Sequence, residues 1–223
     1  MWHKLRKVKS VRISTRTVTA VVAAAAAVWL FAGLAHEVAV GNAGRFDAAV
    51  RGWVHSWSSP ALTLTMRFVT QMGSLWFLLV AGGVAVWRVA ADKRRIAWWF
   101  VATAAGGELL DQILKVEFRR LRPHAFFGLA DPASYSFPSG HSVASFCFYG
   151  ALAVLVVARV RPPLGKAAVG AGAVVVVLLV GLSRVYLGVH YPTDVVGGYL
   201  VAAAWLAAVE AVRTMRATGR SSE

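Results

Sequence analysis

Apolar runs long enough to cross a lipid bilayer constrain this chain more than any other feature. About 18 or more mostly apolar residues can span the hydrocarbon core as one helix, which satisfies its own backbone hydrogen bonds. Six such runs occur, at residues 18–40, 62–90, 96–114, 141–160, 166–183 and 193–212. The sequence therefore predicts an all-α, polytopic membrane protein with six transmembrane helices, in which residues 1–223 form a single domain.

Positive charges predict how these helices are oriented. The chain has 24 Lys and Arg residues, and sixteen of them fall into four clusters, at residues 4–16, 88–95, 159–166 and 213–220. With six spans, all four clusters lie on one side of the membrane, which the positive-inside rule makes cytoplasmic. Both termini, residues 1–17 and 213–223, are then cytoplasmic. This distribution also argues against nucleic-acid binding, despite a net charge of +14.

Two segments and one cysteine have alternative interpretations. The N-terminus resembles a signal peptide with a poor cleavage site at residues 37–39, but its apolar run is long, and we expect it to be retained as a signal anchor. Residues 41–60 predict an external connection, either an ordinary loop or a short interfacial helix with Trp53 and Trp57 at head-group depth. The single cysteine, Cys147, is expected to be a core residue.

Three polar segments adjoin the predicted spans on the external side, beginning at Lys115, Pro138 and Ser183. An Arg side chain binds two phosphate oxygens at once, Lys supplies a compact charge, and a Gly at a helix N-terminus lets backbone N–H groups approach an anion. We expect a phosphate to be held by Lys115, Arg122, Ser139, Gly140 and Arg184. These cations suit phosphoryl transfer without a metal or another cofactor.

Two histidines can supply the chemistry. His190 precedes Asp194 by four residues, so the carboxylate can hold one ring nitrogen and leave the other free to attack phosphorus. His141 would then protonate the departing oxygen and later take a proton from water. Asp111 lies four residues before Lys115, a spacing that favours a supporting ion pair within one helix.

Together these segments resemble the three-part signature of the type 2 phosphatidic acid phosphatase (PAP2) superfamily. The matching motifs, at full spacing, are Lys115-x6-Arg122-Pro123, Pro138-Ser139-Gly140-His141 and Ser183-Arg184-x5-His190-x3-Asp194. The resemblance implies a six-helix membrane phosphatase that forms a phosphohistidine and uses no metal. It extends more weakly to Asp47 and Gly73-Ser74. Leu121 stands where many relatives have Pro, which leaves open the role of Arg120, a possible supporting residue.

The function expected from these residues is hydrolysis of the terminal phosphate of a membrane lipid at the external face of the cell membrane. Undecaprenyl diphosphate is the leading candidate substrate, followed by phosphatidylglycerophosphate and phosphatidic acid. Two other functions stay open. One is a phosphotransferase, which passes the phosphoryl group to an acceptor other than water, and the other is a non-catalytic lipid-phosphate binder or transporter.

Overall fold

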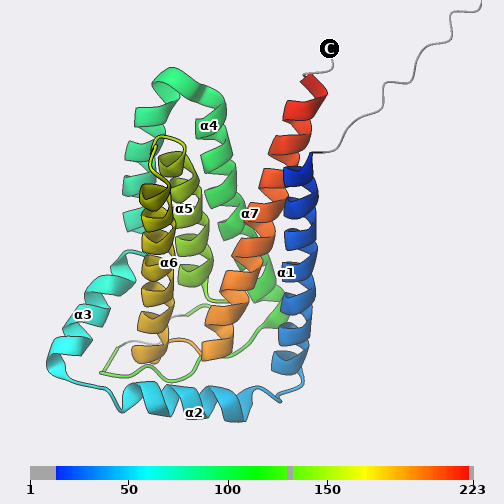
Figure 1. Cartoon of the computed structure of the whole chain (residues 1–223). Coiled ribbons are helices and arrows are strands. Elements are labelled where there is room, and N and C mark those ends of the chain that lie inside the picture. Colours follow the sequence, from blue (N-terminus) through cyan, green and yellow to red (C-terminus); the bar gives the residue numbers. More distant parts are fainter. Residues whose placement is uncertain (1–13, 130–132, 221–223) are drawn as a thin grey trace, which may run out of the picture.

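The computed structural model describes residues 14–129 and 133–220, and every regular element in these ranges is a helix (Figure 1). The all-α prediction is therefore confirmed for the described residues. The helices are α1 Thr15–Ala39, α2 Gly44–His55, α3 Pro60–Gln71, α4 Leu75–Phe118, α5 Gly140–Val157, α6 Pro163–Tyr186 and α7 Pro192–Arg220.

Four or five of the six predicted membrane spans are recognised by length and composition among the described residues. Among the described residues, α1, α5, α6 and α7 are each long and apolar enough to cross a membrane, and α3 with the first part of α4 makes a fifth span if this bent pair is counted as one. The later part of the predicted second span and the whole of the third lie in α4, a continuous helix of 44 residues. The turn expected at residues 91–95 contains no Gly or Pro, so its backbone continues the helical hydrogen bonding.

Helix α4 nevertheless doubles back on itself. Its ribbon rises along the bundle, turns over at the top and descends again (Figure 1). Leu78 and Phe100 belong to one apolar cluster together with Phe148 of α5, although a straight helix would hold residues 22 positions apart at about 33 Å. Both arms of α4 therefore pack against α5, and the second arm returns the chain to the end of the molecule where α4 began.

The predicted second span, residues 62–90, is broken where α3 gives way to α4. The two helices meet at an angle of 49°. Gly73 lies at the break, where a Cβ atom would come within 2.5 Å of Val180 on α6. Ser74 then starts the next helix, because its Oγ accepts a hydrogen bond from the Phe77 amide at 3.4 Å. Close packing at a glycine and a new N-cap thus redirect the chain.

The ends of the helices fall into two groups. The start of α1, the end of α7, the turn of α4 and the α5–α6 connection lie at one end of the bundle (Figure 1). Helices α1 and α7 pack side by side, with Thr17 Oγ1 donating to Thr214 Oγ1 at 2.8 Å. All four basic clusters were predicted to lie on one side of the membrane, which corresponds to this end of the bundle. Residues 4–12 and the side chains of residues 88–95 and 217–220 lie outside the described part.

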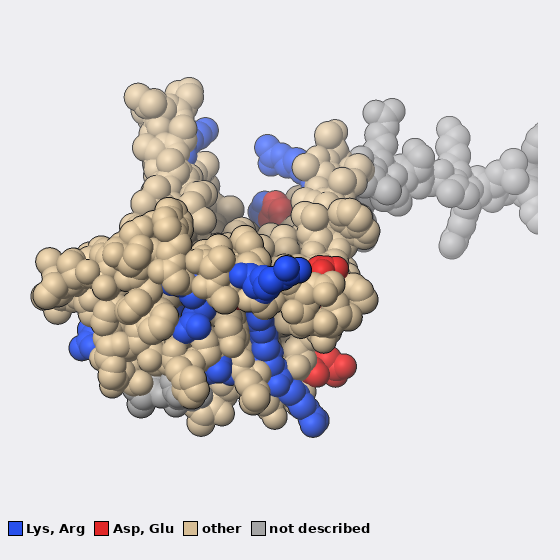
Figure 2. Space-filling model, turned by 90° about the horizontal axis from the view of Figure 1, so that it is seen from below, with Lys and Arg blue, Asp and Glu red and all other residues tan. Residues whose placement is uncertain are grey.

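Helix α2 lies across the opposite end of the bundle (Figure 1). Its inner face buries Asp47 and Val54, whereas Phe46 and Trp53 are exposed. The segment 41–60 therefore carries a short helix, as one of the two interpretations predicted, and is not an ordinary loop throughout. Viewed from this end, Lys and Arg side chains are spread over the surface, and acidic side chains gather toward one edge (Figure 2).

Candidate active site

All ten residues that the sequence singled out come together at the end of the bundle that carries α2. The last turns of α4 and α6 and the first turns of α5 and α7 meet there, together with the irregular segments 119–129 and 133–139. Direct contacts or close electrostatic interactions connect each member to another. They are Asp111, Lys115, Arg120, Arg122, Ser139, Gly140, His141, Arg184, His190 and Asp194.

The predicted pair of His190 and Asp194 is formed and buried. His190 Nδ1 lies 3.2 Å from Asp194 Oδ2, and the two residues are 1% and 0% exposed. Asp194 lies in the first turn of α7, where its Oδ2 also accepts a hydrogen bond from the Tyr191 amide at 2.9 Å. The carboxylate therefore caps the start of α7 and orients the imidazole with the same oxygen atom.

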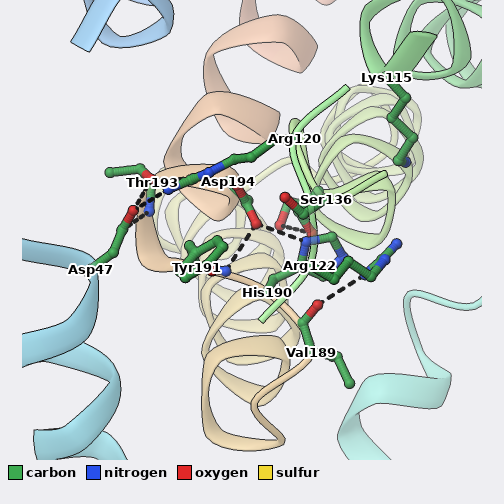
Figure 3. A network of polar contacts seen from close by, with 12 residues as sticks. Asp47, Lys115, Arg120, Arg122, Ser136, Val189, His190, Tyr191, Thr193 and Asp194 are labelled. Carbon is green, nitrogen blue, oxygen red and sulfur yellow. Dashed lines mark hydrogen bonds and ion pairs between the residues drawn. The ribbon is translucent and has the colours of Figure 1, made fainter. Parts of the chain in front are cut away.

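The partner of the second ring nitrogen fixes the tautomer of His190. Arg122 Nη1 lies 2.9 Å from His190 Nε2 (Figure 3). A guanidinium can only donate, so Nε2 accepts this bond and Nδ1 carries the proton that faces Asp194. The same Arg122 side chain donates to the carbonyl oxygens of Val189 at 2.9 Å and Ser134 at 2.7 Å, and to Ser134 Oγ at 2.9 Å. An unshared electron pair on Nε2 thus points at a cation.

Arg120, whose role the sequence left open, holds the other oxygen of Asp194. Its Nη1 donates to Asp194 Oδ1 at 2.6 Å, and its Nη2 donates to Asp47 Oδ2 at 2.6 Å. Leu121 is 78% exposed, so it faces away from the site while Arg120 and Arg122 both face into it. In extended backbone, residues two apart share a face, which explains why Leu can stand at the intervening position.

Lys115 and Asp111 form the predicted ion pair on the last turns of α4. Both are buried, and they pack against the beginning of α5. A Cβ atom on Gly140 would lie 2.8 Å from both Asp111 Oδ2 and Lys115 Nζ. Gly140 therefore does more than expose backbone N–H groups, because it also makes room for the ammonium group beside the N-terminus of α5.

The third cation comes from the end of α6. Arg184 is 9% exposed and donates from Nη1 to Thr70 Oγ1 on α3 at 2.7 Å, while its Nε has no hydrogen-bond partner among the described residues. His141, in the first turn of α5, lies within electrostatic range of both Arg184 and His190. The first N–H groups of α5 point away from the helix without intrahelical partners. The site thus combines three cations with the positive end of a helix.

Four residues outside the predicted set complete these contacts. Asp47 forms an ion pair with Arg120, and Thr193 forms hydrogen bonds with both Asp47 and Arg120. Thr70 accepts a hydrogen bond from Arg184, and Ser134 accepts one from Arg122. The resemblance extended to Asp47, the only acidic residue in the segment 41–60, but assigned it no role. The three hydroxyl residues carry no comparable signal in the sequence.

Burial and positive charge keep the imidazole of His190 neutral. Burial lowers its pKa well below the ordinary value of 6.5, and the charges of Arg122, Arg184 and Lys115 lower it further. A hydrogen bond to the Ser136 backbone opposes these effects in part. A neutral ring whose Nε2 carries no proton is the form of histidine that can act as a nucleophile.

Solution NMR can check this protonation state directly. In protein labelled with 15N-histidine and held in detergent micelles, we expect His190 to give the signals of a neutral Nδ1–H ring at pH 6.5, because its pKa lies below that value. His190→Gln assigns the signals by removing them. Signals of a cationic or Nε2–H ring at this position would contradict the geometry described above.

Comparisons with known proteins agree with this arrangement. A family model described as the PAP2 superfamily matches residues 96–217, more than half of the chain. Phosphatidylglycerophosphatase B of Bacillus subtilis is 37% identical over 147 residues, which cover 63% of this chain and 70% of that protein. The undecaprenyl-diphosphatase BcrC of the same organism is 28% identical over 159 residues, covering 69% of this chain and 75% of that one.

A solved structure has the same fold. The crystal structure of a transmembrane PAP2-type phosphatidylglycerolphosphate phosphatase from Bacillus subtilis superimposes with a TM-score of 0.78 at 29% identity, covering 86% of this chain and 96% of that one. Sequence motifs, site geometry and fold thus agree. The chain belongs to the PAP2 superfamily and is a multi-pass membrane phosphatase of that family.

Proposed function

We propose that this protein removes the terminal phosphate of a membrane lipid through a phosphohistidine intermediate on His190. One observation carries the proposal. The Nε2 electron pair of a buried imidazole faces Arg122, while Asp194 holds Nδ1 on the opposite side. A phosphoryl group that enters between Nε2 and the guanidinium meets a nucleophile on one side and a cation on the other.

The first half-reaction follows from this placement. Nε2 of His190 attacks phosphorus, and the bond between phosphorus and the lipid oxygen breaks. His141 gives its proton to that oxygen as it leaves. Lys115, Arg122 and Arg184 neutralise the three equatorial oxygens, and Asp194 balances the charge that develops on the ring.

The second half-reaction returns the enzyme to its starting state. Water attacks the phosphohistidine, and His141, now without its proton, takes one from that water. The bond between phosphorus and Nε2 breaks, inorganic phosphate leaves, and His190 is again neutral with its proton on Nδ1.

The positive-inside rule supports an external position for the site. The α5–α6 connection carries Arg159, Arg161 and Lys166, and it lies at the same end of the bundle as both described termini (Figure 1). We assign this end to the cytoplasm and the α2 end to the external side. In this orientation the fold passes through the membrane six times, with each arm of α4 as one pass.

Labelling of intact cells tests this orientation. In a Cys147→Ala background, Asn42→Cys on the α2 side should react with an impermeant maleimide, and Leu164→Cys on the α5–α6 side should not. Both positions are exposed, so lysed cells should label equally at the two sites. The opposite pattern in intact cells would place the site at the cytoplasmic face.

An open hollow on the surface of the same end of the bundle is a candidate place for the part of the substrate beyond its phosphate, although none of its lining residues belongs to the site. It measures about 460 Å3, and it lies next to α3, the helix whose Thr70 holds Arg184. Leu64 and Phe68 on α3 are both 72% exposed, which suits contact with lipid chains. The cavity is lined by Ser58, Ser59, Pro60, Thr63, Leu64, Arg67 and Phe127.

Sequence similarity favours phosphatidylglycerophosphate as the substrate, although the sequence alone placed it second. The relative named phosphatidylglycerophosphatase B is 37% identical, against 28% for the one named undecaprenyl-diphosphatase BcrC. We therefore propose phosphatidylglycerophosphate as the first substrate to test, with undecaprenyl diphosphate as the second and phosphatidic acid as the third.

Phosphate release by the purified protein tests the function and the substrate together. We expect release of inorganic phosphate from at least one of the three lipids, and the same rate in excess EDTA, because three side-chain cations already surround the phosphoryl group. A tenfold higher kcat/KM for one lipid, about 1.4 kcal/mol, would identify the preferred substrate. Transfer to another acceptor without free phosphate would indicate a phosphotransferase, and no turnover would indicate a binder.

A further inference from the structure

Asp47 is a fully buried carboxylate on a helix that otherwise lies at the surface. It is 0% exposed, whereas its neighbour Phe46 is 57% exposed. Its Oδ1 accepts a hydrogen bond from the Thr193 amide at 3.0 Å, and its Oδ2 accepts bonds from Thr193 Oγ1 at 2.7 Å and Arg120 Nη2 at 2.6 Å. A buried carboxylate is costly unless such partners compensate it, so this contact is built into the fold.

Arg120 joins Asp47 to the catalytic pair. One branch of its guanidinium binds Asp47, and the other binds Asp194 Oδ1 and Thr193 Oγ1, at 2.6 and 2.8 Å (Figure 3). The group also stacks on the Tyr191 ring, with 4.1 Å between its central carbon and the ring centroid. Burial lowers the pKa of Arg120, but Asp194 and Asp47 more than offset this and raise it. Arg120 is thus a fixed cation shared by two carboxylates.

This sharing has two consequences for Asp194. Its Oδ1 is held by Arg120, so its Oδ2 stays directed at His190 Nδ1. Asp47 also neutralises part of the positive charge of Arg120. Asp194 is therefore less fully neutralised by Arg120, and its negative charge can stabilise the imidazolium that forms with the phosphoenzyme. Without the Asp47 carboxylate, Arg120 would turn freely or pair with Asp194 alone.

We propose that Asp47 is a positioning residue that sets the orientation and charge of the His190–Asp194 pair through Arg120. The proposal rests on the phosphohistidine mechanism. Asp47 touches neither the nucleophile nor the phosphate-binding cations in the described contacts, and its effect falls on the chemical step and not on substrate binding. Helix α2, which carries exposed aromatic residues on its outer side, thereby takes part in catalysis.

The test is steady-state and rapid-quench kinetics of the full-length Asp47→Asn protein in detergent. We expect kcat to fall by roughly tenfold or more, the scale of coupling between contacting residues, with KM within about twofold of wild type. The rate of phosphoenzyme formation should fall with kcat. Glu37→Gln, an exposed carboxylate just before α2, is the matched control and should behave as wild type.

A double mutant separates this role from general damage to the fold. In an Arg120→Gln background, Asp47→Asn should lower kcat by less than about twofold further. The guanidinium that connects Asp47 to Asp194 is already absent in that background. If Asp47→Asn does not fold, Arg120→Lys replaces it in the kinetic measurements. Lys keeps the positive charge, but its ammonium group cannot bind two carboxylates at once as the planar guanidinium does.

The inference would be overturned by an unchanged kcat in Asp47→Asn, by a rise in KM that accounts for the loss, or by additive effects in the double mutant. These outcomes are distinct from failure of the proposed function. That failure would appear in the wild-type protein, as absent phosphate release or as a phosphoenzyme on a residue other than His190.

Discussion

Replacing His190 by alanine will abolish phosphate release and phosphoenzyme formation. No other side chain in the site combines burial, a neutral nitrogen directed at a cation and an orienting carboxylate. The measurement is a base quench of the enzyme with lipid labelled in its terminal phosphate, since phosphohistidine survives base. Wild type should retain label on the protein and the variant should not.

The matched control for this substitution is His36→Ala. His36 is an exposed histidine in the last turn of α1, at the same end of the bundle, and its removal should change neither quantity. Label retained by the His190→Ala protein on another residue would refute the assignment of the nucleophile.

Replacing Asp194 by asparagine will lower kcat by roughly 100-fold or more while the protein still folds. The amide nitrogen cannot accept the Nδ1 proton, so the ring is driven toward the Nε2–H tautomer, which has no electron pair for phosphorus. Because Oδ2 accepts both the Nδ1 proton and the Tyr191 N–H, an amide nitrogen at that position also removes the acceptor of the Tyr191 N–H and weakens the start of α7. Steady-state kinetics and thermal unfolding, measured on the same sample, separate the two effects.

The control for Asp194 lies on the same helix. Glu210→Gln removes a half-buried acid that pairs with Arg213, and it should leave kcat unchanged. A kcat for Asp194→Asn close to that of wild type would mean that the carboxylate does not select the tautomer.

The parts of the site that depend on short spacing could be predicted from the sequence. His190 with Asp194, and Asp111 with Lys115, each lie four residues apart, so local geometry brings them together whatever the rest of the fold does. The role of Arg120 could not be predicted in this way. Its partners Asp47 and Asp194 lie 73 and 74 residues away, and only the packing of α2 against α7 makes them neighbours.

The fold was predictable in class and less so in detail. Apolar runs identify helices, because each membrane helix must contain enough apolar residues. They do not identify where a helix bends. The break between α3 and α4 needs both the close packing at Gly73 and Ser74 as a new N-cap, a combination that hydrophobicity does not reveal. The turn within α4 was predicted at residues 91–95, between two apolar runs, but without Gly or Pro nothing there shows whether its backbone leaves the helix.

The alternation of Arg120, Leu121 and Arg122 limits how the segment between α4 and α5 can change in evolution. Leu121 faces outward, so a different side chain there leaves both guanidinium groups in place. Insertion or deletion of one residue between the two arginines would turn one of them to the opposite face of the extended backbone. Either Asp194 would lose its cation or His190 Nε2 would lose the group it faces. This stretch therefore tolerates changes of composition far better than changes of length.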